Sequence, residues 1–295
     1  MKYKSAAAFR HALEERLRQQ SLQGGQPLVR LRKMVAFDRF LARLAKKEPE
    51  AWIVKGGFAL QLRLGDRART TKDIDLSATN RWTREETTDH LRAAAAQGLG
   101  DWFEFEVGEP AEGATGAPER GYRFPVRCLL DSRQFENFHL DIGFGDPVLE
   151  EPEVLTAPDI LAFAGLAPAR VRCYPLTTQI AEKLHTFTRT YASGDTSRAR
   201  DLADILLAAS LRQFDSATLK RAIHATFEAR ASHDLRPEMP DPPYRIAASY
   251  RQLARELDLA WPTVEEAAQA VARFLNPVLK GDIHATWDPE AWRWR

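Results

Sequence analysis

The chain has 295 residues, of which 44% are hydrophobic and 28% charged, and its formal net charge is +1. This composition is typical of a globular protein with room for about two domains, and the near-neutral charge gives no overall sign of a nucleic-acid partner. The sequence has no run of about 18 apolar residues, so we expect no membrane-spanning helix. Its two cysteines, Cys128 and Cys173, form no zinc motif. The N-terminus lacks a signal-peptide pattern, and we therefore expect a cytoplasmic protein.

Helical apolar spacing and alternating strand patterns both occur before residue 150, which indicates an α+β arrangement. A helix is expected wherever apolar residues recur every three or four positions, and a strand wherever they alternate. The predicted helices cover 5–20, 27–46, 57–64 and 83–97, and the predicted strands cover 51–54, 73–78, 102–107, 122–131 and 137–144.

After about Pro152 the strand patterns fade and helical patterns dominate. We therefore predict a domain boundary near Glu150, with an α+β domain over 1–150 and a helical domain over 151–295. A Gly/Ala/Pro/Glu-rich stretch over 108–121 is predicted to be a loop. The predicted helices of the second half cover 177–190, 196–211, 216–231, 244–257 and 263–279.

Asp73 and Asp75 are the first candidates for chemistry, because they stand one residue apart on a predicted strand. Residues i and i+2 of a strand point to the same face, so the two carboxylates can converge on magnesium, which takes oxygen ligands. An isolated Asp-x-Asp is more often a solvated strand end. Here a Gly-Gly turn lies upstream at a spacing that fits one strand–turn–helix–strand unit, which favours a metal site and chemistry on a nucleoside triphosphate.

Gly56 and Gly57 form that turn, and glycine lets the backbone approach a phosphate at the N-terminus of the following helix. Lys55 stands beside them, where it can pair with phosphate oxygens. The basic loop that contains Thr71 and Lys72 is a second candidate for contact with phosphate or RNA. The alternative interpretation is a tight turn that needs a positive φ, next to a solvated charged loop.

Three further candidates lie later in the chain. Asp141 interrupts an apolar strand, where an unpaired carboxylate is costly, so it is a candidate third metal ligand; the alternative is a strand-edge aspartate satisfied by backbone or arginine. Lys183 stands in a half-buried helical pattern and is a candidate phosphate ligand. Asp201 or Asp204 can orient Lys183 or position an attacking hydroxyl, and ordinary ion pairing within the helix is the alternative.

With these residues in view, the chain resembles the AbiEii/AbiGii-type toxin nucleotidyltransferases. These are the toxin halves of two-gene toxin–antitoxin systems and include the MenT-like toxins. The resemblance spans about residues 52–207. It rests on KGGFALQL at 55–62, TTKDIDLS at 70–77, LDIGFGD at 140–146, the lysine-bearing helix that reaches Lys183, and RARDLADIL at 198–206.

The resemblance implies a DNA-polymerase-β-like nucleotidyltransferase core followed by a helical C-terminal domain. It implies an NTP as co-substrate, Mg²⁺ as cofactor, and transfer of a nucleotide to RNA. In studied relatives the acceptor is the 3′ end of tRNA, so that translation is inhibited, and a cognate antitoxin protein is implied as a partner. By motif position, the paired aspartates are Asp73 and Asp75, the glycine turn is Gly56 and Gly57, the lysine is Lys183, and the late acid is Asp201.

The sequence departs from the family pattern at Arg200, where family members often carry lysine. Arginine keeps the charge but changes the contact geometry. Two alternatives to RNA modification stay open: transfer of a nucleotide to a small molecule or a protein hydroxyl, and a non-catalytic RNA- or partner-binding protein on a transferase core. The intact Asp73 and Asp75 argue against the second, and the core motifs do not separate RNA from other acceptors.

Overall fold

The computed structural model describes residues 2–111, 121–189, 197–281 and 283–295. Most of the predicted loop at 108–121, the predicted helix end at 190 and the predicted helix start at 196 lie outside the described residues. Among the described helices, none combines the length and the apolar character that a membrane crossing requires. The chain divides into two compact units: unit 1 comprises Met1–Gly65, Thr70–Gly145 and Glu153–Cys173, and unit 2 comprises Asp66–Arg69, Asp146–Pro152 and Tyr174–Arg295.

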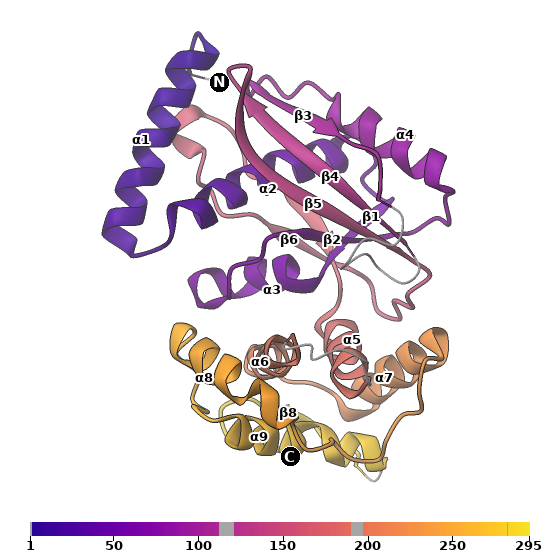
Figure 1. Ribbon diagram of the computed structural model, residues 1–295. Coiled ribbons are helices and arrows are strands. Elements are labelled where there is room, and N and C mark those ends of the chain that lie inside the picture. The colour runs from indigo at the N-terminus through magenta and orange to yellow at the C-terminus, as the bar shows by residue number, and fades with distance from the viewer. Residues whose placement is uncertain (1, 112–120, 190–196, 282) are drawn as a thin grey trace. The chain divides into compact units, whose positions relative to one another are not determined.

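Unit 1 is built on a mixed sheet, seven-stranded in the described residues, with the order β3-β4-β5-β2-β1-β7-β6 (Figure 1). Strands β2 and β5 are parallel neighbours, as are β1 and β7, and the other neighbours are antiparallel. The strands are β1 (Trp52–Lys55), β2 (Ile74–Ala78), β3 (Phe103–Val107), β4 (Gly121–Leu130), β5 (Arg133–Phe144), β6 (Glu153–Thr156) and β7 (Arg170–Cys173).

The helices of unit 1 begin and end at the signals that the sequence carries. Ser5 caps α1 by accepting a hydrogen bond from the backbone N–H of Ala8, and Gly25 ends the helix in the left-handed region. Thr83 and Glu86 form a capping box at the start of α4. The α-helices of this unit are α1 (Ala6–Gly24), α2 (Leu28–Lys47), α3 (Gly56–Leu64) and α4 (Arg84–Ala95), which confirms the predicted helices with small shifts at their ends.

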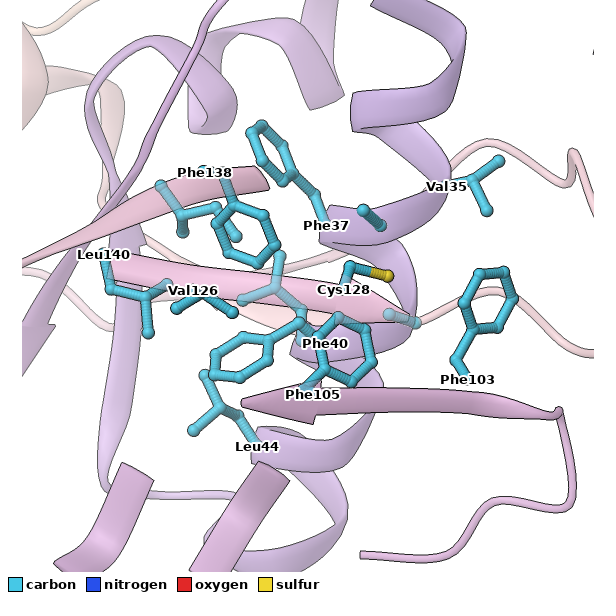
Figure 2. Close-up of a cluster of buried hydrophobic side chains, with 14 of the residues drawn as sticks. Val35, Phe37, Phe40, Leu44, Phe103, Phe105, Val126, Cys128, Phe138 and Leu140 are labelled. Carbon is cyan, nitrogen blue, oxygen red and sulfur yellow. The ribbon is translucent and has the colours of Figure 1, made fainter. Parts of the chain in front are cut away.

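The core of unit 1 lies between α2 and one face of the sheet (Figure 2). Phe40 of α2 packs edge-on against Phe105 of β3 and Phe138 of β5, with ring centroids 5.3 and 5.8 Å apart. Leu140 lies two residues beyond Phe138 and is fully buried on the same face. Because side chains alternate along a strand, His139 and Asp141 point to the face opposite α2.

Strands β6 and β7 lie in a segment where the sequence pattern indicated mostly helices. Each is four residues long, and together they form an antiparallel pair whose inner strand joins β1 through Val54 and Cys173. The sequence EVLT of β6 does not alternate apolar and polar residues, and RVRC of β7 alternates with only two apolar residues. The sheet therefore extends past the point where its sequence signal ends.

Unit 2 is mainly helical, as predicted, and α6 is its central element. Every residue of α6 except Arg200 is buried, and the helix packs against α5, α8 and α9. Trp287 of the C-terminal hairpin is fully buried and donates its indole N–H to the Ala209 carbonyl at 2.9 Å. The elements are α5 (Leu176–Thr188), α6 (Arg198–Ala209), α7 (Ser216–Arg230), α8 (Ala247–Glu256) and α9 (Val264–Lys280), followed by the hairpin β8 (Trp287–Asp288) and β9 (Arg293–Trp294).

A buried ion pair ties α2 to the start of β3. Arg43 donates to both carboxylate oxygens of Asp101, at 2.9 and 2.6 Å, and to the carbonyl of Phe103 at 2.7 Å. Both side chains of the pair are at most 2% exposed. The charge of Arg43 is therefore balanced by Asp101 rather than by water, whereas Asp101 also lies 3.8 Å from Nη1 of Arg39.

Replacing Asp101 by asparagine should lower the free energy of unfolding by about 3–5 kcal/mol, because Arg43 would then be a buried charge without its counterion. Asp131→Asn is the matched control: Asp131 accepts from Arg133 at the same 2.6 Å, but in a pair whose side chains are 26% and 66% exposed. The control should lose less than about 1 kcal/mol. Urea denaturation followed by circular dichroism measures both, and equal losses would contradict this account.

Candidate active site

Four adjacent strands place charged residues in one row across the sheet face opposite α2. The register pairs Lys55 of β1 with Asp75 of β2, Asp75 with Asp141 of β5, and Asp141 with Arg123 of β4. Residues directly opposite each other on neighbouring strands project to the same face. The row therefore holds two central carboxylates flanked by two cations.

Asp73 lies just before β2 begins, and basic groups contact both of its oxygens. Its Oδ2 accepts from Arg123 Nη2 at 2.8 Å. Its Oδ1 accepts from the backbone N–H of His139 at 3.3 Å and lies 3.2 Å from Nδ1 of the same residue. Arg123 also lies against Asp141, with Nη1 at 3.4 Å from Oδ2. Arg123 thus bridges Asp73 and Asp141.

Asp141 is the buried carboxylate of this group. Burial raises the pKa of Asp141 to about 7, and the negative charges of Asp75 and Asp73 add to this effect against the opposing charges of Arg123 and Lys55. Its Oδ1 is buried and has no hydrogen-bond partner among the described residues. An unsatisfied buried carboxylate oxygen is costly, and a bound cation relieves that cost.

The donor set fits a hard divalent cation in its chemistry, because such cations take carboxylate oxygens. In the described part of the chain, however, no group of three or more His, Cys, Asp or Glu residues is arranged to hold a metal ion. The contacts of Asp73 explain the difference: Arg123 and His139 engage the oxygens that an ion would need.

The carboxylate of Asp75 leaves no space for a side chain at position 56, so this residue must be glycine. Its φ is +63°, and a Cβ at this position would lie 2.0 Å from Asp75 Oδ2. The carboxylate therefore packs directly on the glycine backbone, which only glycine permits. Gly57 is buried in the first turn of α3, and Lys55 precedes the helix without providing a side-chain cap. The positive end of the helix dipole thus lies beside Asp75.

The other predicted nucleotide-binding residues lie in the loop that enters β2. Thr71 is buried, and its hydroxyl donates to the Asp73 carbonyl at 3.2 Å. Lys72 is exposed. Thr71 therefore shapes the backbone that carries Asp73, whereas Lys72 faces solvent.

A second charged cluster lies within unit 2. Lys183 of α5 contacts Asp201 at 3.0 Å and Asp204 at 2.9 Å, both on α6. Arg69 donates two hydrogen bonds of 2.9 Å to Asp204, and Arg198 pairs with Asp201 at 2.8 Å. Burial lowers the pKa of Lys183, but the two carboxylates outweigh it and raise the pKa above its usual value. The lysine is therefore held in its charged form.

The same cluster shifts the pKa of Asp204 in the opposite direction. Burial raises it, but Arg69 and Lys183 outweigh burial and hold the pKa below its usual range. Asp204 therefore stays ionised between two cations. Both aspartates contact Lys183, and the predicted alternative of pairing within the helix also occurs, between Arg198 and Asp201.

The candidates named from the sequence that lie close together in unit 1 are Lys55, Gly56, Asp73, Asp75 and Asp141. Sequence reasoning missed two residues of this group, Arg123 and His139. His139 carries a signal, because it lies two positions before Asp141 on a predicted strand and so shares its face. Arg123 carries no local signal, since its place depends on the pairing of β4 with β5.

Comparison with known proteins agrees with the fold. The family model described as "Nucleotidyl transferase AbiEii toxin, Type IV TA system" matches residues 39–294. The structure of MenT4, a nucleotidyltransferase toxin from Mycobacterium tuberculosis H37Rv, gives a TM-score of 0.58 at 20% identity, covering 95% of this chain and 92% of that chain. A putative nucleotidyltransferase from H. pylori gives a TM-score of 0.44 at 17% identity, covering 85% and 96%. Among curated proteins, none matched the chain.

Replacing Gly56 by alanine should destabilise the protein more than the left-handed φ alone explains, because the new methyl group would displace the Asp75 carboxylate. Gly25→Ala is the matched control: its φ is +67°, and nothing lies within 4 Å of the added Cβ. The control should lose about 1–2 kcal/mol of unfolding free energy from backbone strain. Chemical denaturation of both variants measures the difference, and equal losses would show that Asp75 does not constrain Gly56.

Replacing Asp141 by asparagine should produce a pH-dependent gain in stability in buffer that contains EDTA. The pKa of Asp141 is raised from 3.8 to about 7 in the folded protein, so its stabilising contribution is full below pH 3.8 and is lost as the pH rises through 7. The substituted asparagine stays neutral throughout. Relative to the wild type, the variant should therefore gain about 4 kcal/mol of unfolding free energy between pH 4 and pH 8. Urea denaturation at both pH values tests this, and a constant difference would contradict it.

Proposed function

Because the chain belongs to the AbiEii family of nucleotidyltransferase toxins of type IV toxin–antitoxin systems, we propose that it transfers a nucleotide from an NTP to RNA. The proposed acceptor is the 3′ end of tRNA, and the proposed consequence is inhibition of translation in the cytoplasm. The observation that carries the proposal is the charged row of unit 1, in which Asp75 packs on Gly56 at the start of α3 and lies beside Asp141. A toxin family also implies a cognate antitoxin as partner.

The reaction is a displacement at phosphorus. An acceptor hydroxyl forms a bond to the α-phosphorus, the bond from that phosphorus to the bridging oxygen breaks, and pyrophosphate leaves with the electron pair. We propose that Asp73, Asp75 and Asp141 would hold Mg²⁺. When bound, this ion would neutralise triphosphate charge and assist deprotonation of the hydroxyl.

The glycine turn is the proposed binding element for the triphosphate. Gly56 and Gly57 present backbone rather than side chains at the start of α3, and the helix dipole favours an anion there. Lys55 brings a positive charge to the same row. Thr71 and Lys72 are the proposed contacts on the adjoining loop, Thr71 by fixing the backbone before Asp73 and Lys72 through its solvent-facing charge.

Lys183 and Asp201 are the proposed catalytic residues of unit 2. Two carboxylates hold the ammonium group of Lys183 charged, so that it suits phosphate binding as a point charge. Asp201 fixes the position of that ammonium group, and Asp204 shares the task through its own contact. Arg69 and Lys183 keep Asp204 ionised, and Arg198 donates a hydrogen bond to Asp201.

The Asp75→Ala variant tests the proposed function. The variant should keep its fold but lose more than about 100-fold in transfer of label from α-³²P-labelled NTPs to total tRNA, because the carboxylate at the glycine turn is removed. Asp131→Asn, on the exposed turn between β4 and β5, should transfer at the wild-type rate. Parallel reactions with total cell protein and with aminoglycosides identify the acceptor class. Undiminished transfer by Asp75→Ala, or label only on protein or small molecule, would overturn the proposal.

A further inference from the structure

Arg123 is a residue of unit 1 that no sequence motif indicated and that contacts Asp73 and Asp141. Its guanidinium group lies 2.8 Å from Asp73 Oδ2 and 3.4 Å from Asp141 Oδ2. It therefore contacts two of the three carboxylates proposed to hold a divalent cation. Its side chain is 17% exposed, so it lies at the surface edge of the cluster rather than within the core.

The backbone fixes Arg123 in this place. Strand pairing sets it directly opposite Asp141. Two residues earlier in the chain, a Cβ at Gly121 would lie 1.8 Å from the carbonyl oxygen of Ile142, so the strands approach closely there. Tyr122 packs its ring against Phe124 and Phe144, at 6.2 and 5.6 Å between centroids. The register of Arg123 is thus held on both sides.

Arginine and a divalent cation have the same requirement at this site. A guanidinium group stays charged at all accessible pH values and pairs with carboxylate oxygens. A hard cation takes those same oxygens as ligands. Asp73 Oδ2 and Asp141 Oδ2 both face Arg123. An ion at these carboxylates would share their negative charge with the guanidinium group and would be repelled by it, so the two cations compete there.

We propose that Arg123 is a positioning residue that holds Asp73 and Asp141 in the cation-free protein and competes with the divalent cation for their oxygens. This inference rests on the cation site of the proposed function. Arg123 keeps two like charges together when no ion is bound, and it lowers the affinity of the site for the ion. The cation affinity of the resting protein is then set by a residue of β4 that lies outside the family motifs.

The test uses the full chain without nucleotide, freed of metal by EDTA and dialysis, and Mn²⁺ as the probe. Free Mn²⁺ is measured by electron paramagnetic resonance during a titration of the wild type, Arg123→Gln and Arg127→Gln. Arg127 is the matched control, because it lies on the same strand and pairs with Glu106 at 3.0 Å in an exposed pair. Arg123→Gln should bind Mn²⁺ about tenfold more tightly than the wild type, which is the effect of losing one charged hydrogen bond. Arg127→Gln should match the wild type.

Thermal denaturation separates this role from a merely structural one. Without Mn²⁺, Arg123→Gln should melt below the wild type, because the carboxylates lose their counterion, and Mn²⁺ should raise its melting temperature more than that of the wild type. A lower melting temperature without any gain in Mn²⁺ affinity would overturn the proposal. Arg123→Lys keeps a point charge but loses the planar fork, so its affinity should fall between the two. If Arg123→Gln does not fold, wild-type affinity in Arg123→Lys overturns the proposal.

The outcomes also distinguish this inference from the proposed function. Equal Mn²⁺ affinity in the wild type and Arg123→Gln would overturn the competition alone, and the cation site would stand. No Mn²⁺ binding by either protein would overturn both the competition and the cation site.

Discussion

Repulsion between carboxylates on one sheet face is the constraint on which the rest of unit 1 depends. Asp75 and Asp141 are cross-strand neighbours, and Asp73 adds a third negative charge beside them. Like charges directly opposite each other destabilise a sheet. The fold offsets this by placing Lys55 and Arg123 at the two ends of the row and a helix N-terminus against Asp75. The electrostatic strain of unit 1 and the catalytic role that we propose for it thus arise from the same charges, which the strand register holds together.

The sequence predicts those parts of the site that depend on short-range spacing. Two aspartates one residue apart, a glycine pair before a helix and an aspartate within an apolar strand are local patterns, and the structure gathers them on one face of unit 1. The family, the nucleotidyltransferase fold and the α+β class are confirmed by the comparisons and the structure. The short strands β6 and β7 were missed because β6 does not alternate apolar and polar residues and the alternation in β7 includes only two apolar residues.

Arg123 shows why the rest of the site could not be predicted. The turn that joins β4 and β5 has positive φ at both central residues and pairs Leu130 with Arg133. If the pairing continued regularly from this turn, Arg123, seven residues before Leu130, would lie opposite Leu140, seven residues after Arg133. The bulge between Cys128 and Leu129 shifts the register by one residue, and Arg123 pairs with Asp141 instead. A register shift of one residue moves every side chain to the opposite face of the sheet. This single bulge therefore decides whether Arg123 faces the core or the carboxylates.

The segment Asp66–Arg69 belongs to unit 2, although it is flanked in sequence by unit 1 on both sides. Arg69 of this segment donates two hydrogen bonds to Asp204, which is buried on α6. During translation, Arg69 is added to the chain well before Asp204, the residue with which it pairs. A C-terminal fragment that starts at Tyr174 would lack it altogether. In that fragment Asp204 would keep Lys183 as a counterion but lose Arg69, so a cut at Tyr174 would remove one of the two cations that balance this buried charge.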